Sequence, residues 1–300
     1  MAPSIERSRL RRAFDDARRF LALVYQKAAE DRIFFLAGAI AFNVLVAFVP
    51  LILAVLGITT AVLRQQNADV TGVLMNYVMG ALPDAGEDFR EKVRTLFEGF
   101  TDASTGLLGI GTVFFVWIAT RLVGTLRTVL GEVFDLTRDR GIIAGKLFDL
   151  KMVVAAGSLF AVNVGVTIIL NIIAGFGREM FGFDAGSLGY AGYVWAQLIA
   201  FGFIWVMFLM IYRYLPLRRI GWRTVIIAAS FTAVLFELMK QGFSVYAQVA
   251  DYGSVYGNLT FLLILIFWIY YAAVVFILGG VVAQVATMQR IRRQQRERLT

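Results

Sequence analysis

Two stretches of this chain are too long and too apolar for a soluble protein. Residues Ile33–Leu63 carry no charged side chain over 31 positions, and residues Tyr252–Gln289 carry none over 38. A membrane-spanning helix needs about 20 apolar residues, and buried helices of soluble domains are usually shorter. The composition agrees, because 59% of the residues are hydrophobic and 17% are charged, against roughly 45–50% and about 25% in soluble domains. The sequence therefore predicts an integral membrane protein.

Six segments have the length and hydropathy of membrane-spanning helices. A helix rises about 1.5 Å per residue, so about 20 residues cross a hydrocarbon core of roughly 30 Å. The predicted spans are Phe34–Leu63, Leu107–Val123, Met152–Phe176, Tyr190–Tyr214, Thr224–Tyr246 and Val255–Val285. The predicted fold class is all-α, a polytopic bundle of six transmembrane helices.

Basic residues are distributed unevenly between the two sides of this bundle. The N-terminal arm, the second-to-third and fourth-to-fifth connections and the C-terminal tail hold 23 of the 29 lysines and arginines, and the opposite side holds 5. Because Lys and Arg are retained in cytoplasmic loops, both termini are expected in the cytoplasm. The same distribution accounts for the net charge of +8 and argues against nucleic acid as a partner.

The chain divides into three predicted parts. Residues 1–32 form a basic amphipathic arm, residues 33–287 form the six-helix domain, and residues 288–300 form a basic cytoplasmic tail. The arm is expected to lie on the cytoplasmic leaflet, where its arginines either bind anionic headgroups or only anchor the topology. The loop 64–106 predicts an extracytoplasmic helical hairpin. Apolar residues at helical spacing define one face of the arm: Leu10, Phe14, Ala17, Leu21 and Val24.

The residue types that are absent limit the chemistry. The chain contains no histidine and no cysteine, which removes Cys/His zinc sites, thiolate nucleophiles, Ser-His-Asp triads and disulfides. The acidic residues of the loop 64–106 fit a solvated face better than a catalytic pair. We therefore expect no catalytic residue, no metal, no cofactor and no enzymatic activity.

Ionisable side chains at membrane depth are costly, so they mark candidate sites. Glu237 and Lys240 lie three residues apart on one helix face and can pair. They form either a self-neutralising pair, with Arg121 reaching the interface, or part of a hydrated pathway. The candidate polar pathway comprises Arg121, Asn163, Asn171, Glu237, Lys240 and Gln241. The candidate headgroup-binding residues are Arg11, Arg18, Arg213, Arg218 and Arg219.

Three motifs resemble the YihY/BrkB family of bacterial inner-membrane proteins. They are AGAIAFNVLVAFVP at Ala37–Pro50, YRYLP at Tyr212–Pro216 and YGSVYG at Tyr252–Gly257, with Trp222-Arg223 and Trp268–Tyr270 after the second and third. The resemblance implies a six-helix protein of the bacterial inner membrane, linked to envelope integrity and lipid passage. A historical ribonuclease name of the family is rejected here, because zinc nucleases of that name need a histidine-rich metal cluster.

The chain departs from the family pattern at three positions. Asn43 stands where the family usually has an aromatic residue, and Ala47 stands where it has a serine. Val281 occupies the place of a glutamate near the end of the last span. A role of that glutamate in proton or ion coupling is therefore not carried over to this chain.

Two function classes remain open. One is a translocator of lipid or another amphiphile, in which basic cytoplasmic rims collect anionic headgroups. The other is a scaffold for envelope assembly, in which polar residues only hold the helices together. A homo-oligomer or a complex with another envelope protein is compatible with either class.

The six-span topology is testable with reporter fusions. A reporter after Thr300 and one inserted near Arg140 are expected to report a cytoplasmic location, whereas one inserted near Gly86 is expected to report an extracytoplasmic location, because an odd number of spans separates Gly86 from each of the other two sites. A cytoplasmic signal near Gly86 would contradict the six-span arrangement.

Overall fold

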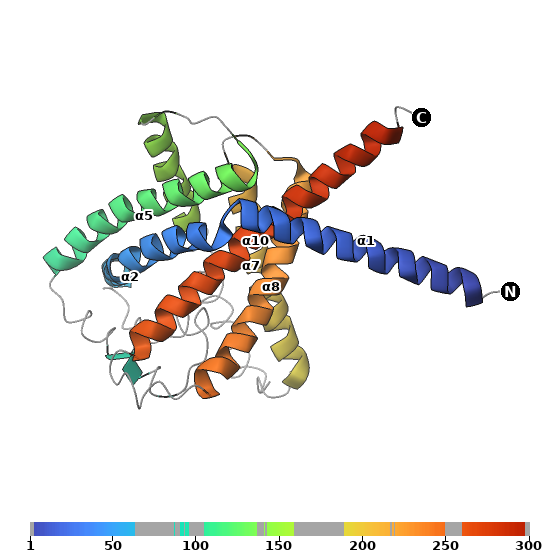
Figure 1. The fold of residues 1–300 in the computed structure, drawn as a ribbon. Coiled ribbons are helices and arrows are strands. Elements are labelled where there is room, and N and C mark those ends of the chain that lie inside the picture. Colours follow the sequence, from blue (N-terminus) through green and yellow to red (C-terminus); the bar gives the residue numbers. More distant parts are fainter. Residues whose placement is uncertain are drawn as a thin grey trace.

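The computed structural model describes most of the chain as long helices (Figure 1). The described residues are 3–63, 87, 91–92, 94–95, 105–136, 141, 143–158, 189–216, 218, 220–249 and 260–297, and they contain no strand. The helices are α1 (Pro3–Glu30), α2 (Ile33–Leu63), α5 (Thr105–Val133), α7 (Gly189–Tyr214), α8 (Trp222–Val249) and α10 (Thr260–Glu297). A further helix covers residues 143–158.

The described helices are those of a membrane protein. Three of them, in α5, α8 and α10, are long and apolar enough to cross a membrane, and a fourth span follows if the bent pair α1–α2 counts as one. The predicted all-α membrane class is confirmed at this level. The predicted hairpin in 64–106 and the third span beyond residue 158 lie outside the described residues, apart from a few positions.

Three predicted helix boundaries were wrong. The second span was predicted to end at Val123, but α5 continues to Val133. The third was predicted to begin at Met152, but its helix begins at residue 143. Arg127, beyond the predicted end of the second span, and Asp149, before the predicted start of the third, pair with each other inside the two helices. The sixth was predicted to end at Val285, but α10 continues to Glu297 and carries most of the basic tail as helix.

The helices α1 and α2 meet in a sharp elbow. Their axes bend by 59° at the break between them, where Arg32 has a left-handed φ of 50°. The last turn of α1 closes with the Asp31 N–H donating to the Lys27 carbonyl at 2.9 Å. As a result, α1 projects away from the other helices, with the N-terminus far from the bundle (Figure 1).

The elbow also divides the apolar face that was predicted for the arm. Val24 is 7% exposed and belongs to the hydrophobic core, together with Ala28. Phe14 and Leu21 are exposed instead. The helix keeps the predicted spacing, and the elbow brings only the last part of this face, with Val24, against the bundle.

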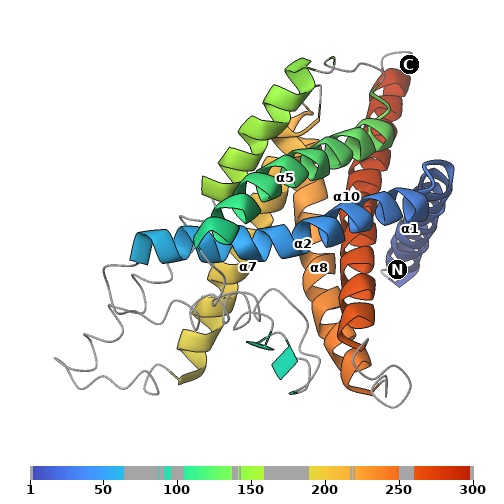
Figure 2. The same ribbon diagram turned by 90° about the vertical axis from the view of Figure 1, so that its left-hand side faces the viewer.

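Helix α10 lies at the centre of the structure. It contacts α1, α2, α5 and α8, and Figure 2 shows it running beside α8 and crossing α2. Two adjacent glycines make these close contacts possible. A Cβ on Gly279 would lie 1.8 Å from Thr232 Oγ1, and one on Gly280 would lie 3.0 Å from Val133 Cγ1.

A buried hydroxyl pair fills the space beside Gly279. The Tyr212 hydroxyl of α7 donates to the Phe276 carbonyl of α10 and lies 2.8 Å from Thr232 Oγ1 of α8. Both side chains are fully buried. Tyr212 also stacks on the Phe276 ring, with centroids 5.1 Å apart. The Tyr212 hydroxyl therefore connects α7 with both α8 and α10.

Replacing Gly279 with alanine is expected to destabilise the protein, because the added methyl group overlaps Thr232 and separates α8 from α10. Overpacking of a dense core typically costs about 1–3 kcal/mol. Gly242→Ala in α8 is the matched control, because a Cβ there meets nothing within 4 Å. Thermal unfolding in detergent measures the difference, and equal midpoints for the two variants would contradict the packing described here.

Candidate functional site

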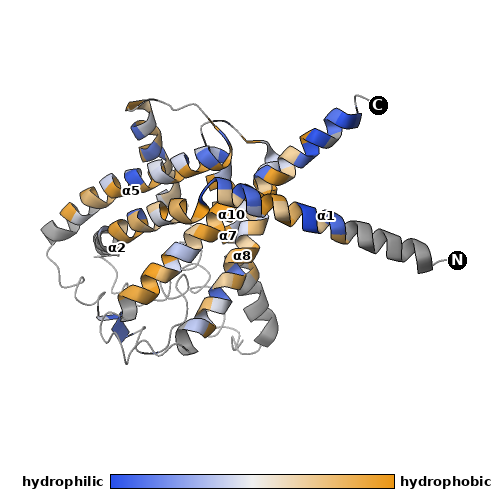
Figure 3. Ribbon diagram, in the orientation of Figure 1, coloured by the Kyte–Doolittle hydropathy of each residue, from blue (hydrophilic) through white to orange (hydrophobic). Residues whose placement is uncertain are grey.

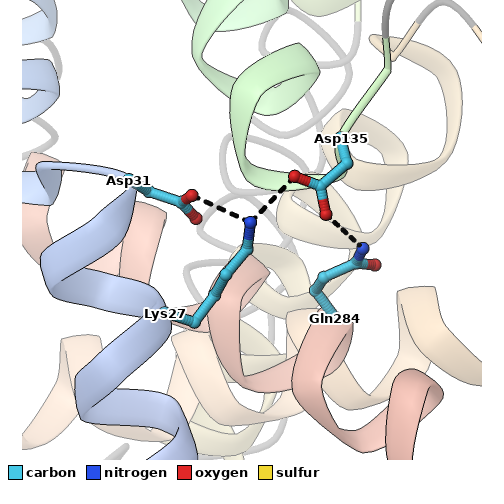
Figure 4. Close-up of polar contacts among 4 residues, drawn as sticks. All are labelled: Lys27, Asp31, Asp135 and Gln284. Carbon is cyan, nitrogen blue, oxygen red and sulfur yellow. Dashed lines mark hydrogen bonds and ion pairs between the residues drawn. The ribbon is translucent and has the colours of Figure 1, made fainter.

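A group of four polar residues joins three helices at one end of the bundle, and we call it the charged junction (Figure 4). The Lys27 ammonium lies 2.9 Å from Asp31 Oδ1 and 2.8 Å from Asp135 Oδ1. The Gln284 amide donates to Asp135 Oδ2 at 3.2 Å. The junction therefore links the α1–α2 elbow, the segment after α5, and α10.

The position of Asp135 follows from how α5 ends. The Leu136 N–H donates to the Gly131 carbonyl at 2.8 Å, and Asp135 has a left-handed φ of 52°. This is a helix C-cap of the Schellman type. Aspartate and asparagine adopt the left-handed conformation more readily than most residues. The cap thus holds the Asp135 carboxylate against Lys27.

The junction places one ammonium between two carboxylates in unequal surroundings. The side chains of Lys27 and Asp31 are 9% and 7% exposed, whereas that of Asp135 is 57% exposed. Burial lowers the pKa of Lys27, but hydrogen bonds to Asp135 and Asp31 outweigh burial and raise it overall. Burial also raises the pKa of Asp31, although Lys27 acts against this. The Asp135 carboxylate therefore helps to keep Lys27 charged. Together with burial, it also makes Asp31 harder to ionise.

A second buried ion pair joins α5 to the helix at 143–158. Arg127 Nε lies 3.2 Å from Asp149 Oδ1, and Arg127 Nη2 donates to Asp149 Oδ2 at 3.3 Å. The side chains are 12% and 5% exposed. Glycines on both helices make room for the pair, since a Cβ on Gly124 would lie 3.2 Å from Asp149 Oδ2 and one on Gly145 would lie 3.0 Å from Arg127 Nη2.

Of the predicted pathway residues, the structure brings two together. Lys240 Nζ lies 2.9 Å from Glu237 Oε2, and the side chains are 25% and 26% exposed. Gln241, the next residue on α8, is exposed. Arg121 is exposed on a different helix, α5, and Asn163 and Asn171 lie outside the described residues. The geometry thus supplies the pair, and its role in a pathway remains a prediction.

The predicted headgroup-binding arginines occupy different environments. Arg18 and Arg218 are exposed, and the side chains of Arg11 and Arg219 lie outside the described part of the structure. Arg213 is half-buried between α7 and α8. Its guanidinium donates to the Ile220 carbonyl and lies 4.6 Å from the centre of the Trp222 ring. Arg213 therefore closes the α7–α8 turn, which uses part of its binding capacity.

The junction and the Arg127–Asp149 pair were missed in the sequence. Their bases lie at the ends of predicted spans, where they were counted only as topology signals. Their acids lie up to 108 residues away along the chain from the bases that they contact. An aspartate with apolar neighbours, such as Asp149 between Phe148 and Leu150, was the one available signal.

Lys27→Met is expected to destabilise the protein by roughly 3–5 kcal/mol, because it leaves the buried Asp31 carboxylate without its charge partner. Asp135→Asn is expected to cost about 0–1 kcal/mol, because that carboxylate is largely exposed. Adding Asp31→Asn to Lys27→Met should restore part of the lost stability. Unfolding in detergent, monitored by tryptophan fluorescence, tests this order of stability among the variants. A Lys27→Met variant as stable as Asp135→Asn would count against the junction.

Most of the chain is similar to known proteins. Residues 24–299 match the family described as Virulence factor BrkB. The chain is similar to a UPF0761 membrane protein of Aeromonas salmonicida, with 27% identity over 271 residues that cover 88% of each chain. A second such protein, of Pseudoalteromonas translucida, is 26% identical over 85% of this chain and 81% of its own length.

Some relatives are longer than this chain. A UPF0761 membrane protein of Chlorobium phaeobacteroides is 28% identical over 87% of this chain, but the match covers 56% of its own length. No solved structure matches. Because the family match covers nearly the whole chain, the protein belongs to the BrkB/YihY family of membrane proteins.

Proposed function

We propose that this protein facilitates the passage of lipid or another amphiphile across the bacterial inner membrane, without enzymatic activity, metal or cofactor. It spans the membrane six times with both termini in the cytoplasm, and anionic lipids are its partners. The observation that carries the proposal is the Glu237–Lys240 ion pair on α8.

The topology is supported by contacts between segments distant in sequence. At one end of the bundle, Lys27 of the arm and Gln284 of α10 both contact Asp135 in the second-to-third connection. The hydroxyl of Thr224, near the start of α8, lies 2.8 Å from that of Thr287 in α10. These segments are the ones that carry the excess of Lys and Arg. Because these segments meet at one end of the bundle, an even number of membrane crossings is favoured between any two of them.

The pathway is supported by where the Glu237–Lys240 pair lies. Glu237 is 13 residues beyond Thr224, which places it roughly 20 Å from the cytoplasmic end of α8. Its neighbours Val234 and Leu238 are 50% and 58% exposed. The pair thus borders an apolar outer surface of the described bundle, where charge is costly. Water or a polar headgroup passing along α8 would offset that cost.

A scaffold for envelope assembly is the alternative, and a different observation favours it. The most deeply buried charges, in the Arg127–Asp149 pair and at Lys27, connect one helix with another. Such contacts position helices without moving a substrate. In that case the Glu237–Lys240 pair only neutralises itself.

Liposomes containing the purified protein and a fluorescent lipid separate the two proposals. Chemical quenching of the outer leaflet measures how fast inner-leaflet lipid becomes accessible. The Glu237→Gln/Lys240→Met variant is expected to stay folded, since joint replacement of a pair is often nearly neutral, but to lose most of the passage. The reversed pair, Glu237→Lys/Lys240→Glu, is the matched control and should retain passage, because it keeps both charges. Wild-type protein no faster than empty liposomes would favour the scaffold.

A further inference from the structure

Helix α1 has two sides with different surroundings. On the side toward the bundle, Val24 and Lys27 are buried near the elbow, and α1 contacts α10. Farther from the elbow, residues 14–19 are exposed all around the helix. On the outer side, Phe14, Leu21 and Tyr25 are exposed in the described structure, at 71%, 66% and 77%. Spacings of seven and four residues place Phe14, Leu21 and Tyr25 on one line along the helix. Three large apolar side chains on one line therefore lack a covering partner among the described residues.

Arginines interrupt this line at regular positions. Arg18 is exposed and lies four residues after Phe14 and three before Leu21, so it falls on the same face. By spacing alone, Arg11 falls on this face too, three residues before Phe14. We define the α1 stripe as Arg11, Phe14, Arg18, Leu21 and Tyr25. Apolar side chains that alternate with guanidinium groups suit a bilayer interface, where rings enter the acyl boundary and arginines bind phosphate.

The surroundings of the stripe favour lipid over protein as its cover. Immediately after the elbow, Phe34 and Phe35 are 64% and 76% exposed in the first turn of α2. Since α2 is an apolar helix of a membrane protein and burial of such side chains in hydrocarbon is favourable, acyl chains are a fitting cover for Phe34 and Phe35. Figure 3 shows apolar residues of α1 close to this elbow, with hydrophilic residues beside them. A lipid surface that covers Phe34 and Phe35, nine and ten residues after Tyr25, would thus begin just beyond the elbow.

The charged junction fixes the direction in which the stripe points. Lys27 follows Tyr25 by two residues, so its side chain leaves the helix on nearly the opposite side. Because Lys27 also contacts Asp135, which lies beyond the end of α5, a rotation of α1 about its axis would break that ion pair. The stripe is therefore held on the side away from the bundle.

We infer that the α1 stripe is a docking surface for the anionic cytoplasmic leaflet, held in its rotational setting by the charged junction. The arginines bind lipid phosphates, and Phe14, Leu21 and Tyr25 enter the interface between headgroups and acyl chains. This inference rests on the membrane placement in the proposed function, but not on lipid passage.

The absence of cysteine from the chain makes the test direct, because single cysteines can be introduced into the full-length protein and spin-labelled. The stripe variants are Phe14→Cys, Leu21→Cys and Tyr25→Cys. The matched controls, Arg19→Cys and Gln26→Cys, are exposed positions on another face of α1. In vesicles of equimolar phosphatidylcholine and phosphatidylglycerol, the ratio of accessibility to oxygen over a nickel chelate is expected to be several-fold higher for the stripe. Adding Arg18→Gln, or using pure phosphatidylcholine, should lower the ratio at residue 21.

A label at Phe42→Cys on α2, where the side chain is 61% exposed and lies away from the Glu237–Lys240 pair, provides the membrane reference. If that label is in lipid while the stripe labels are in water, the inference fails and the proposed membrane placement stands. If the stripe labels are shielded from both reagents, protein covers the stripe, as in a dimer, and the inference also fails. If the Phe42 label itself is in water, the membrane placement fails, and the inference fails with it.

Discussion

The contact of Tyr212 and Thr232 with the glycine pair of α10 sets the positions of the other helices. The Gly279 Cα permits an approach that no side chain would allow, because even a methyl group would lie 1.8 Å from Thr232 Oγ1. In return, the two hydroxyls satisfy each other and the Phe276 carbonyl where water is excluded. Gly280 on the same helix receives Val133 of α5. Helices α5, α7 and α8 are thus all positioned against a few residues of α10.

The described ion pairs have three different roles, and the burial of their side chains distinguishes these roles. Arg127 and Asp149 are almost fully buried and connect two consecutive helices. Lys27 is equally buried but connects the arm to the distant Asp135, so it restrains the rotation and direction of α1. Glu237 and Lys240 are a quarter exposed and belong to one helix, so their ion pair connects no two helices of the described structure. A pair without a connecting role is the one to which a transport role can be assigned.

The junction and the α1 stripe depend on each other physically. A surface helix with exposed arginines and aromatic residues could rotate freely if nothing anchored it. Here Lys27 gives α1 one permitted rotation, and the membrane would stabilise that rotation by covering Phe14, Leu21 and Tyr25. Through Asp135, the arm is connected to the end of α5 and to Gln284 of α10.

The membrane class, the bounds of α7 and α8 within a few residues, and the pairing of Glu237 with Lys240 could all be predicted from the amino-acid sequence. These features follow from local pattern, because hydropathy and helical spacing act over a few turns. The continuation of α5 past Arg127, the burial of Val24 but not of Phe14 or Leu21, and the contact of Lys27 with Asp135, 108 residues away, could not be predicted without the packing of the helices. A charge at a helix end looks the same in a sequence whether water or a distant carboxylate neutralises it. Which of the two it meets depends on how the helices pack.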